Sequence, residues 1–112
     1  MSEIPLSKPD ITDAEIQAVV ETLKSGRLSI GPQSISFEQA VARRAERTHG
    51  VAVSSGTAGL HLVLKALDIG PGDEIITTPF SFIASANCIL FVGAKPVFVD
   101  IDPRSLNLAP EA

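Results

Sequence analysis

The sequence predicts an α/β fold in which helices cover a parallel sheet, preceded by two further helices. From Val51 onward, short apolar segments alternate with segments of helical periodicity, in the order strand, helix, strand, helix, strand. This alternation is typical of parallel sheets, whose strands are joined by helical crossovers. Before Val51, two segments carry apolar residues at helical spacing. We therefore divide the chain into an amino-terminal helical segment, residues 1–50, and the start of an α/β domain, residues 51–112.

The composition is that of an ordinary globular protein. The chain has 112 residues, of which 45% are hydrophobic and 20% charged, with a net charge of -4 and an isoelectric point near 5.0. This balance argues against a nucleic-acid partner, which usually requires a basic stripe. No apolar run approaches the roughly 20 residues of a membrane span, and no secretory signal is evident. We expect a soluble, cytoplasmic protein with no membrane partner.

The first helix is predicted over residues 12–26. Thr12 is followed three residues later by Glu15, which is the spacing of a capping box. Gly26 is expected to end the helix in a left-handed conformation. Between them, one apolar stripe recurs at helical spacing and consists of Ile16, Val19, Val20 and Leu23.

A second helix is predicted from about Gln33 to Arg47, ending before His49 and Gly50. Three arginines near its end, Arg43, Arg44 and Arg47, are expected to form a solvated face rather than a binding patch. The inward face is expected to consist of Phe37, Ala40, Val41 and Ala45.

The α/β part is expected to contain strands at 51–53, 74–78 and 95–100. The connecting helices are predicted at about 57–67 and 82–91, with a turn of Gly, Pro, Gly and Asp between the first helix and the next strand. Pro79 is expected to end the middle strand, Ser81 to cap the second of these helices, and Gly93 to terminate it.

The loop Ser54-Ser55-Gly56-Thr57 follows the first of these strands directly. Ligands bind open α/β sheets at the carboxyl ends of their strands. The first N–H groups of the next helix lack partners within the helix and carry partial positive charge, so they favour an anion such as phosphate. From these residues alone, a second interpretation stays open: Ser55 or Thr57 simply caps the helix. The sequence contains neither a Walker loop nor the dinucleotide fingerprint.

Phe82 lies at the next strand-to-helix junction, where an aromatic ring could stack on a flat ligand. The alternative is that Phe82 belongs to the core, as we expect for Phe91 and Phe98. At the third junction, Asp102 before Pro103 is interpreted as a turn and capping residue.

The remaining reactive side chains predict no metal site. His61 projects from a mostly apolar helix and is expected to be a buried or half-buried imidazole rather than a ligand. Cys88, the single cysteine, is expected to be a small buried hydrophobe, which fits a reducing compartment.

Taken together, the segment from Val51 to Leu108 resembles the amino-terminal part of the DegT/DnrJ/StrS sugar aminotransferases. The motifs Ser-Gly-Thr-Ala, Gly-Pro-Gly-Asp-Glu, Pro-x-Ser-Phe-x-Ala and Pro-Val-Phe-Val-Asp occur in the family's order. The upstream segments RLSIGP and FEQAVARR also fit. The resemblance covers nearly the whole chain.

The resemblance implies the large domain of an aspartate-aminotransferase-type fold, the three-layer αβα arrangement of PLP fold type I. It implies pyridoxal 5′-phosphate as cofactor, with Gly56, Thr57 and Ala58 at its phosphate and Phe82 stacked on its ring. In the family's seven-stranded sheet, later strands separate the one matching 51–53 from the one matching 74–78. The family's active sites lie at the interface of a homodimer.

The activity implied by the resemblance is amino-group transfer from glutamate to a keto group on a nucleotide-linked sugar, a step of amino-sugar and polysaccharide biosynthesis. Some relatives instead dehydrate the sugar. The family's imine-forming lysine lies in a Ser-x-His-x-x-Lys segment that this sequence lacks, and the family's aspartate at the ring nitrogen also comes later. None of Lys8, Lys24, Lys65 and Lys95 has the required context.

We therefore expect a fragment of a longer enzyme or a truncated gene product, with no catalytic residue in this chain and no transaminase turnover by itself. The alternative is a non-catalytic relative retained for binding a phosphate ligand or for pairing with another chain.

Overall fold

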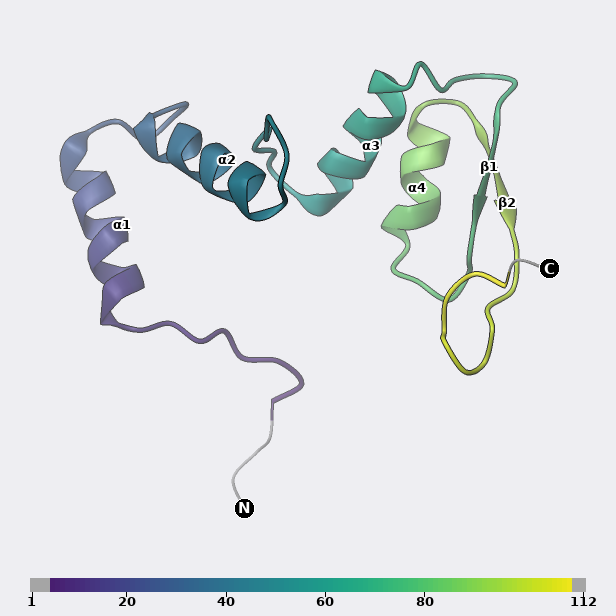
Figure 1. Ribbon diagram of the computed structural model, residues 1–112, viewed down its shortest axis with the longest axis horizontal. Coiled ribbons are helices and arrows are strands. Elements are labelled where there is room, and N and C mark those ends of the chain that lie inside the picture. The colour runs from purple at the N-terminus through teal and green to yellow at the C-terminus, as the bar shows by residue number, and fades with distance from the viewer. Residues whose placement is uncertain (1–4, 110–112) are drawn as a thin grey trace. The chain divides into compact units, whose positions relative to one another are not determined.

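The computed structural model describes residues 5–109 and divides into two compact units, Met1–Ala52 and Val53–Ala112. The first unit contains helices α1 (Asp13–Ser25) and α2 (Pro32–Arg44). The second contains α3 (Gly56–Ala66), β1 (Glu74–Thr77), α4 (Ala84–Phe91) and β2 (Lys95–Phe98), in that order (Figure 1).

Helix α1 begins and ends as the sequence predicts. The Thr12 N–H donates to Glu15 Oε2 at 2.7 Å, and the Thr12 side chain accepts from the backbone of Glu15, which completes the capping box. The Ala14 N–H also donates to Thr12 Oγ1, at 3.3 Å. Gly26 ends the helix with φ at 69°. The predicted apolar stripe is largely exposed: Ile16, Val19 and Leu23 each keep more than half of their surface.

Helix α2 ends three residues earlier than predicted, at Arg44. Glu46 adopts a left-handed conformation with φ at 54°, and the Arg47 N–H donates to the Ala42 carbonyl at 2.8 Å. The Glu46 N–H also donates to the Arg43 carbonyl at 3.1 Å. Together these two bonds form a Schellman motif, so a local hydrogen-bond pattern ends the helix before His49 and Gly50.

The predicted inward face of α2 is wrong. Ala42 is the buried residue of this helix, whereas Phe37 remains 60% exposed and Val41 47% exposed. Ala40 and Ala45 are exposed as well. Burying that face would require a second layer, which the described part of this unit does not supply.

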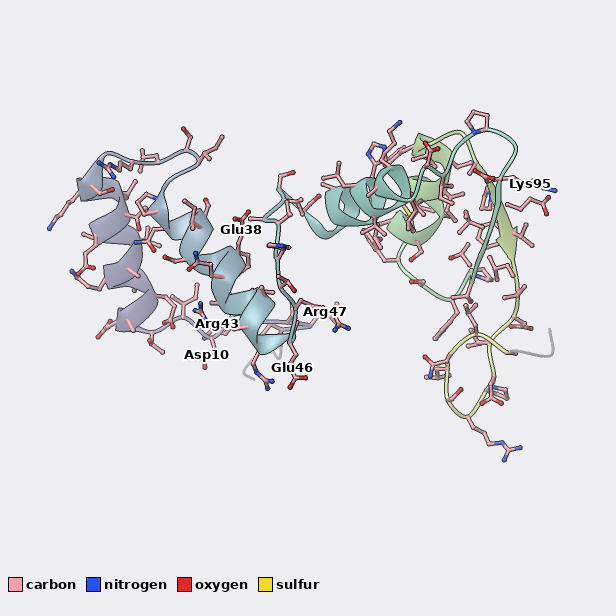
Figure 2. The ribbon with its side chains drawn as sticks, turned by 45° about the horizontal axis from the view of Figure 1, so that its top comes forward. Asp10, Glu38, Arg43, Glu46, Arg47 and Lys95 are labelled. Atoms are coloured by element: carbon pink, nitrogen blue, oxygen red, sulfur yellow. The ribbon has the colours of Figure 1, made fainter. Side chains whose placement is uncertain are left out.

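The arginines at the end of α2 are solvated, as expected. Arg43, Arg44 and Arg47 are all exposed, and Arg43 and Arg47 extend to different sides of the end of the helix (Figure 2). Arg43 and Arg47 therefore do not share one basic patch.

The second unit is built on a parallel pair of strands. β1 and β2 pair from Glu74 opposite Lys95 to Thr77 opposite Phe98, and Lys95 Nζ lies 2.7 Å from Glu74 Oε1 at the start of the ladder. The parallel arrangement confirms the α/β prediction. The core is small and centred on α4; it consists of Cys88, Ile89, Val92 and Ala94, with Leu64, Ile69 and Ile75 packed against them.

Two predictions of local structure for residues 51–112 are wrong. Residues 51–53 form no strand. A strand needs a hydrogen-bonded partner strand, and in the described structure β1 and β2 pair with each other and not with residues 51–53. Ser81 does not cap α4, which begins at Ala84 after Ile83 without a side-chain cap. The Ser81 hydroxyl instead lies 3.0 Å from the Ser85 hydroxyl.

Candidate phosphate-binding site at the start of α3

The start of α3 is capped by Ser55. Ser55 has extended backbone angles, and its Oγ accepts a hydrogen bond from the Ala58 N–H at 3.1 Å. The Ser55 carbonyl accepts the first bond of the helix, from the Gly59 N–H at 3.0 Å. The capping interpretation therefore holds for Ser55 and not for Thr57.

Capping by Ser55 satisfies one donor at this helix end and leaves others available. Within the described part of the chain, the N–H groups of Gly56 and Thr57 and the Thr57 hydroxyl donate no hydrogen bond. The backbone at Gly56 is open, since a Cβ built there would meet no atom within 4 Å. Two N–H groups and a hydroxyl at a helix start are the donor set that suits a phosphate group. Capping and anion binding are thus compatible here.

Phe82 lies in the loop between β1 and α4 and is 76% exposed. It lines a hollow together with Thr78, Pro79, Ser81, Ile83, Ala86 and Phe98. The alternative that Phe82 is core, like Phe91 and Phe98, is wrong for this structure: Phe91 is 57% and Phe98 54% exposed. The ring of Phe82 is accessible to a flat ligand.

The helices and strands next to these residues have the relevant ends on one side of the second unit. The starts of α3 and α4 and the carboxyl ends of β1 and β2 all lie toward one end of the second unit, the lower end in Figure 1. Residues 56–58 and Phe82 therefore belong to the end of the sheet at which open α/β folds bind ligands.

The other residues singled out from the sequence have structural roles. The half-buried His61 ring packs edge-on against Phe91, with ring centres 5.6 Å apart. Cys88 is buried, and its thiol lies 3.4 Å from the Ser85 carbonyl. Among residues 5–109, no group of three His, Cys, Asp or Glu side chains could hold a metal ion, and no helix is long and apolar enough to cross a membrane.

Asp102 organises the turn that follows β2. Its Oδ1 accepts hydrogen bonds from the N–H groups of Ser105 at 2.8 Å and Arg104 at 3.0 Å. Those bonds, first from Ser105 and then from Arg104, hold the pKa of this carboxyl below its ordinary value. The predicted turn role is confirmed.

One residue that sequence reasoning missed is Glu38 on α2. Its Oε1 accepts a hydrogen bond from the Ala52 N–H at 2.8 Å, three residues before the Ser55 cap. The sequence gives no signal for this bond. Glu38 lies on the polar side of a predicted amphipathic helix, and the pattern of apolar residues carries no information about a hydrogen-bond partner 14 residues away.

A parallel pair of strands packed with helices defines the second unit as an α/β protein, and the start of α3 is its candidate site for an anion. The match to family models then identifies the lineage: residues 9–112 match the DegT/DnrJ/EryC1/StrS aminotransferase family. The chain therefore belongs to this family, as its sequence motifs indicate.

Two curated relatives cover most of the chain. It is 46% identical over 103 residues to the UDP-4-amino-4-deoxy-L-arabinose–oxoglutarate aminotransferase of Shewanella sediminis, covering 92% of this chain and 26% of that protein. It is 52% identical over 107 residues to the spore coat polysaccharide biosynthesis protein SpsC of Bacillus subtilis, covering 96% and 28%. The chain thus spans about a quarter of the length of these relatives.

Solved structures place the fold in the same group. A protein of Streptococcus pneumoniae, described as a proposed sugar aminotransferase, matches in its apo form with a TM-score of 0.92 and 41% identity, over 96% of this chain and 27% of its own. Its PMP and PLP forms match with a TM-score of 0.91 each. The fold is therefore the amino-terminal part of the PLP-dependent aminotransferase fold, and the solved forms are consistent with pyridoxal phosphate as the family's cofactor.

Proposed function

We propose that this chain forms the amino-terminal part of a PLP-dependent aminotransferase that transfers an amino group from glutamate to a nucleotide-linked keto sugar. The observation that carries the proposal is the 46% identity to a relative whose name contains both a UDP-linked amino sugar and oxoglutarate. Oxoglutarate is the keto acid that glutamate becomes when it gives up its amino group. The match over nearly the whole chain supports the same reaction class.

The start of α3 is proposed to hold the cofactor's phosphate. The N–H groups of Gly56 and Thr57 and the Thr57 hydroxyl would donate to it, aided by the positive end of the helix. Ala58 shares its N–H with Ser55, so its part is to hold the first turn in shape beside the phosphate. The Phe82 ring would stack on the cofactor's ring and orient it.

When bound, pyridoxal phosphate supplies an electron sink for the carbanion that forms when a proton leaves the amino donor. This chain would bind and orient that group. It lacks the family's lysine segment, so we propose that the chain alone does not turn over. In the complete protein, further segments and a second subunit would complete the site, in a cytoplasmic homodimer.

The experiment uses the complete protein that contains residues 1–112. Its affinity for pyridoxal phosphate is measured by absorbance titration for wild type, Thr57→Ala and Thr57→Ser. Loss of a hydrogen bond to a charged group should raise the dissociation constant roughly tenfold or more in Thr57→Ala. Thr57→Ser keeps the hydroxyl and should stay within about twofold of wild type. Ser34→Ala, an exposed change on α2, is the remote control.

Amino transfer is tested with glutamate and a UDP-linked keto sugar, and oxoglutarate formation is followed. Turnover by the complete protein supports the proposal. Absence of both cofactor binding and amino transfer in the complete protein would instead favour the non-catalytic module. Turnover by the 112-residue chain alone would contradict the proposed incompleteness of its site.

A further inference from the structure

Ser81 and Ser85 join the loop that carries Phe82 to the first turn of α4. Their hydroxyl oxygens lie 3.0 Å apart, so the two side chains share a hydrogen bond. Ser81 directly precedes Phe82, and Ser85 is the second residue of α4. All three residues belong to the second unit. The serine pair therefore closes a short ring of chain that includes Phe82.

A second hydrogen bond ties the backbone of Phe82 to the same serine. The Ser85 N–H donates to the Phe82 carbonyl at 3.0 Å. Ser85 thus holds both Phe82 and the residue before it. An exposed bond between two hydroxyl groups contributes little by itself, but two bonds from one residue to adjacent positions restrict the same few backbone dihedral angles. These angles set the direction of the Phe82 side chain.

Ser85 is in turn fixed to the core of the second unit. Its neighbours Ala84 and Ala86 are buried, with 7% and 9% of their surface exposed. The Cys88 thiol donates to the Ser85 carbonyl at 3.4 Å, and Cys88 belongs to the core cluster. A continuous series of contacts therefore leads from the core through Ser85 to Phe82.

A residue that stacks on a ligand needs such an anchor. The face of the ring that meets the ligand cannot be held by protein packing, because the ligand occupies it. The position of the ring then depends on its backbone and on its side-chain rotamer. Aromatic rings gain stacking energy only at centre-to-centre distances of about 4.5–7 Å, so a displaced backbone would weaken the contact.

We propose that Ser85, through its bonds to Ser81 and Phe82, is a positioning residue for the stacking of Phe82 on the cofactor's ring. Ser85 touches neither the cofactor nor the reacting atoms and acts through Phe82. By holding the loop before the ligand arrives, it lowers the conformational entropy lost on binding. This inference rests on the proposed function, because it takes pyridoxal phosphate as the flat ligand.

The experiment is a double-mutant cycle in the complete protein, measured by absorbance titration with pyridoxal phosphate. Ser85→Ala removes the hydroxyl and should raise the dissociation constant about threefold, near the low end for a net hydrogen bond. Phe82→Ala should raise it about fivefold through lost stacking. In the Phe82→Ala background, Ser85→Ala should change the constant by less than about 1.5-fold, because the residue through which it acts is gone. Ser85→Thr keeps the hydroxyl and should restore wild-type affinity.

A second variant removes the same bond from the other side. Ser81 is exposed, so Ser81→Ala keeps the test decisive if Ser85→Ala gives insoluble protein. It should weaken cofactor binding to a similar degree, and the two changes together should add no further loss. Hydrogen exchange at the Ser85 amide should speed up in cofactor-free Ser81→Ala protein. Ser105→Ala, an exposed change on the turn after β2, is the matched control and should leave both measurements unchanged.

The outcomes separate this inference from the proposed function. If Ser85→Ala leaves cofactor affinity unchanged while Thr57→Ala and Phe82→Ala weaken it, Ser85 does not position the ring and the proposed function stands. An equal loss from Ser85→Ala with and without the Phe82 ring would assign the effect to the general stability of α4 and overturn the inference. If none of these variants changes cofactor binding, both the inference and the proposed site fail.

Discussion

Gly50 lies so close to α2 that a side chain would not fit there. A Cβ at this position would approach the Glu38 carbonyl oxygen to 2.6 Å, and a backbone oxygen cannot move aside as a flexible side chain can. We expect Gly50→Ala to destabilise the complete protein by about 1–3 kcal/mol, the usual cost of overpacking. Urea unfolding measures the change. In the control Gly59→Ala, the added Cβ meets only Val53 at 3.6 Å, and the helix propensity of alanine should make this change neutral or stabilising. Equal effects of the two changes would contradict the packing argument.

The turn at Asp102 should weaken in acid. Hydrogen bonds from the N–H groups of Ser105 and Arg104 lower the pKa of the carboxyl. A carboxyl whose pKa is depressed by folding stabilises the fold above its unfolded pKa, and this contribution is lost as the pH falls through its folded pKa. An NMR titration of the Asp102 side chain should therefore give a midpoint below that of aspartate in an unstructured peptide. Asp102→Asn keeps an acceptor without titrating and should remove this part of the pH dependence. A midpoint at or above the peptide value would refute the assignment.

At the scale of single elements, helix α3 ends at a residue for which glycine would be a better choice. Asp68 has a left-handed conformation with φ at 59°, and the Ile69 N–H donates to the Leu64 carbonyl at 3.0 Å. A non-glycine residue costs roughly 1 kcal/mol or more in this conformation. We expect Asp68→Gly to stabilise the protein by about 1 kcal/mol.

The matched control places the same residue type three positions earlier. Lys65 lies inside α3, where glycine costs about 1 kcal/mol relative to a good helix former. Lys65→Gly should therefore lower the free energy of unfolding while Asp68→Gly raises it, as measured by urea titration of both variants. The same sign for both changes would show that α3 does not end in this way in the complete protein.

The elements also show how far sequence reasoning reaches. The capping box of α1, the Ser55 cap and the parallel strands are set by residues close in sequence or by local periodicity, and these were predictable. The end of α2 was not, because Glu46 takes a left-handed conformation that its residue type does not signal. The strand at 51–53 was not formed, because sheet pairing depends on partners that a local pattern cannot supply.

Part of the candidate site could likewise be predicted from the sequence, and part could not. The donors of Gly56 and Thr57 follow from a polar loop that opens an apolar helix, so the sequence suffices to predict them. The exposure of Phe82 does not follow from the sequence, since an aromatic residue between a strand and a helix is as compatible with the core. The bond from Ala52 to Glu38 joins residues 14 positions apart and requires coordinates.

For the whole molecule, the second unit leaves an apolar face open. A hollow of about 230 Å³ is lined by residues of α3, β1 and α4. Around it, Ile76 is 62%, Val63 56% and Leu60 45% exposed. Such a contiguous face is typical of a surface that packs against further protein. The relatives of this chain are about three and a half times its length, which is consistent with a face that is covered in the complete protein.

The open apolar face leads to a prediction that tests whether further segments cover it in the complete protein. In the complete protein, Ile76→Ala should cost about 2–4 kcal/mol, close to the cost of Ile89→Ala, because both side chains would be buried there. From the structure of this chain alone, the two should differ widely, since Ile89 is 1% exposed and Ile76 62%, and a change at an exposed site usually stays within about 0.5 kcal/mol. Urea unfolding of the complete protein measures both. A cost below about 0.5 kcal/mol for Ile76→Ala, alongside a large cost for Ile89→Ala, would mean that the face stays open and that the chain functions without a covering segment.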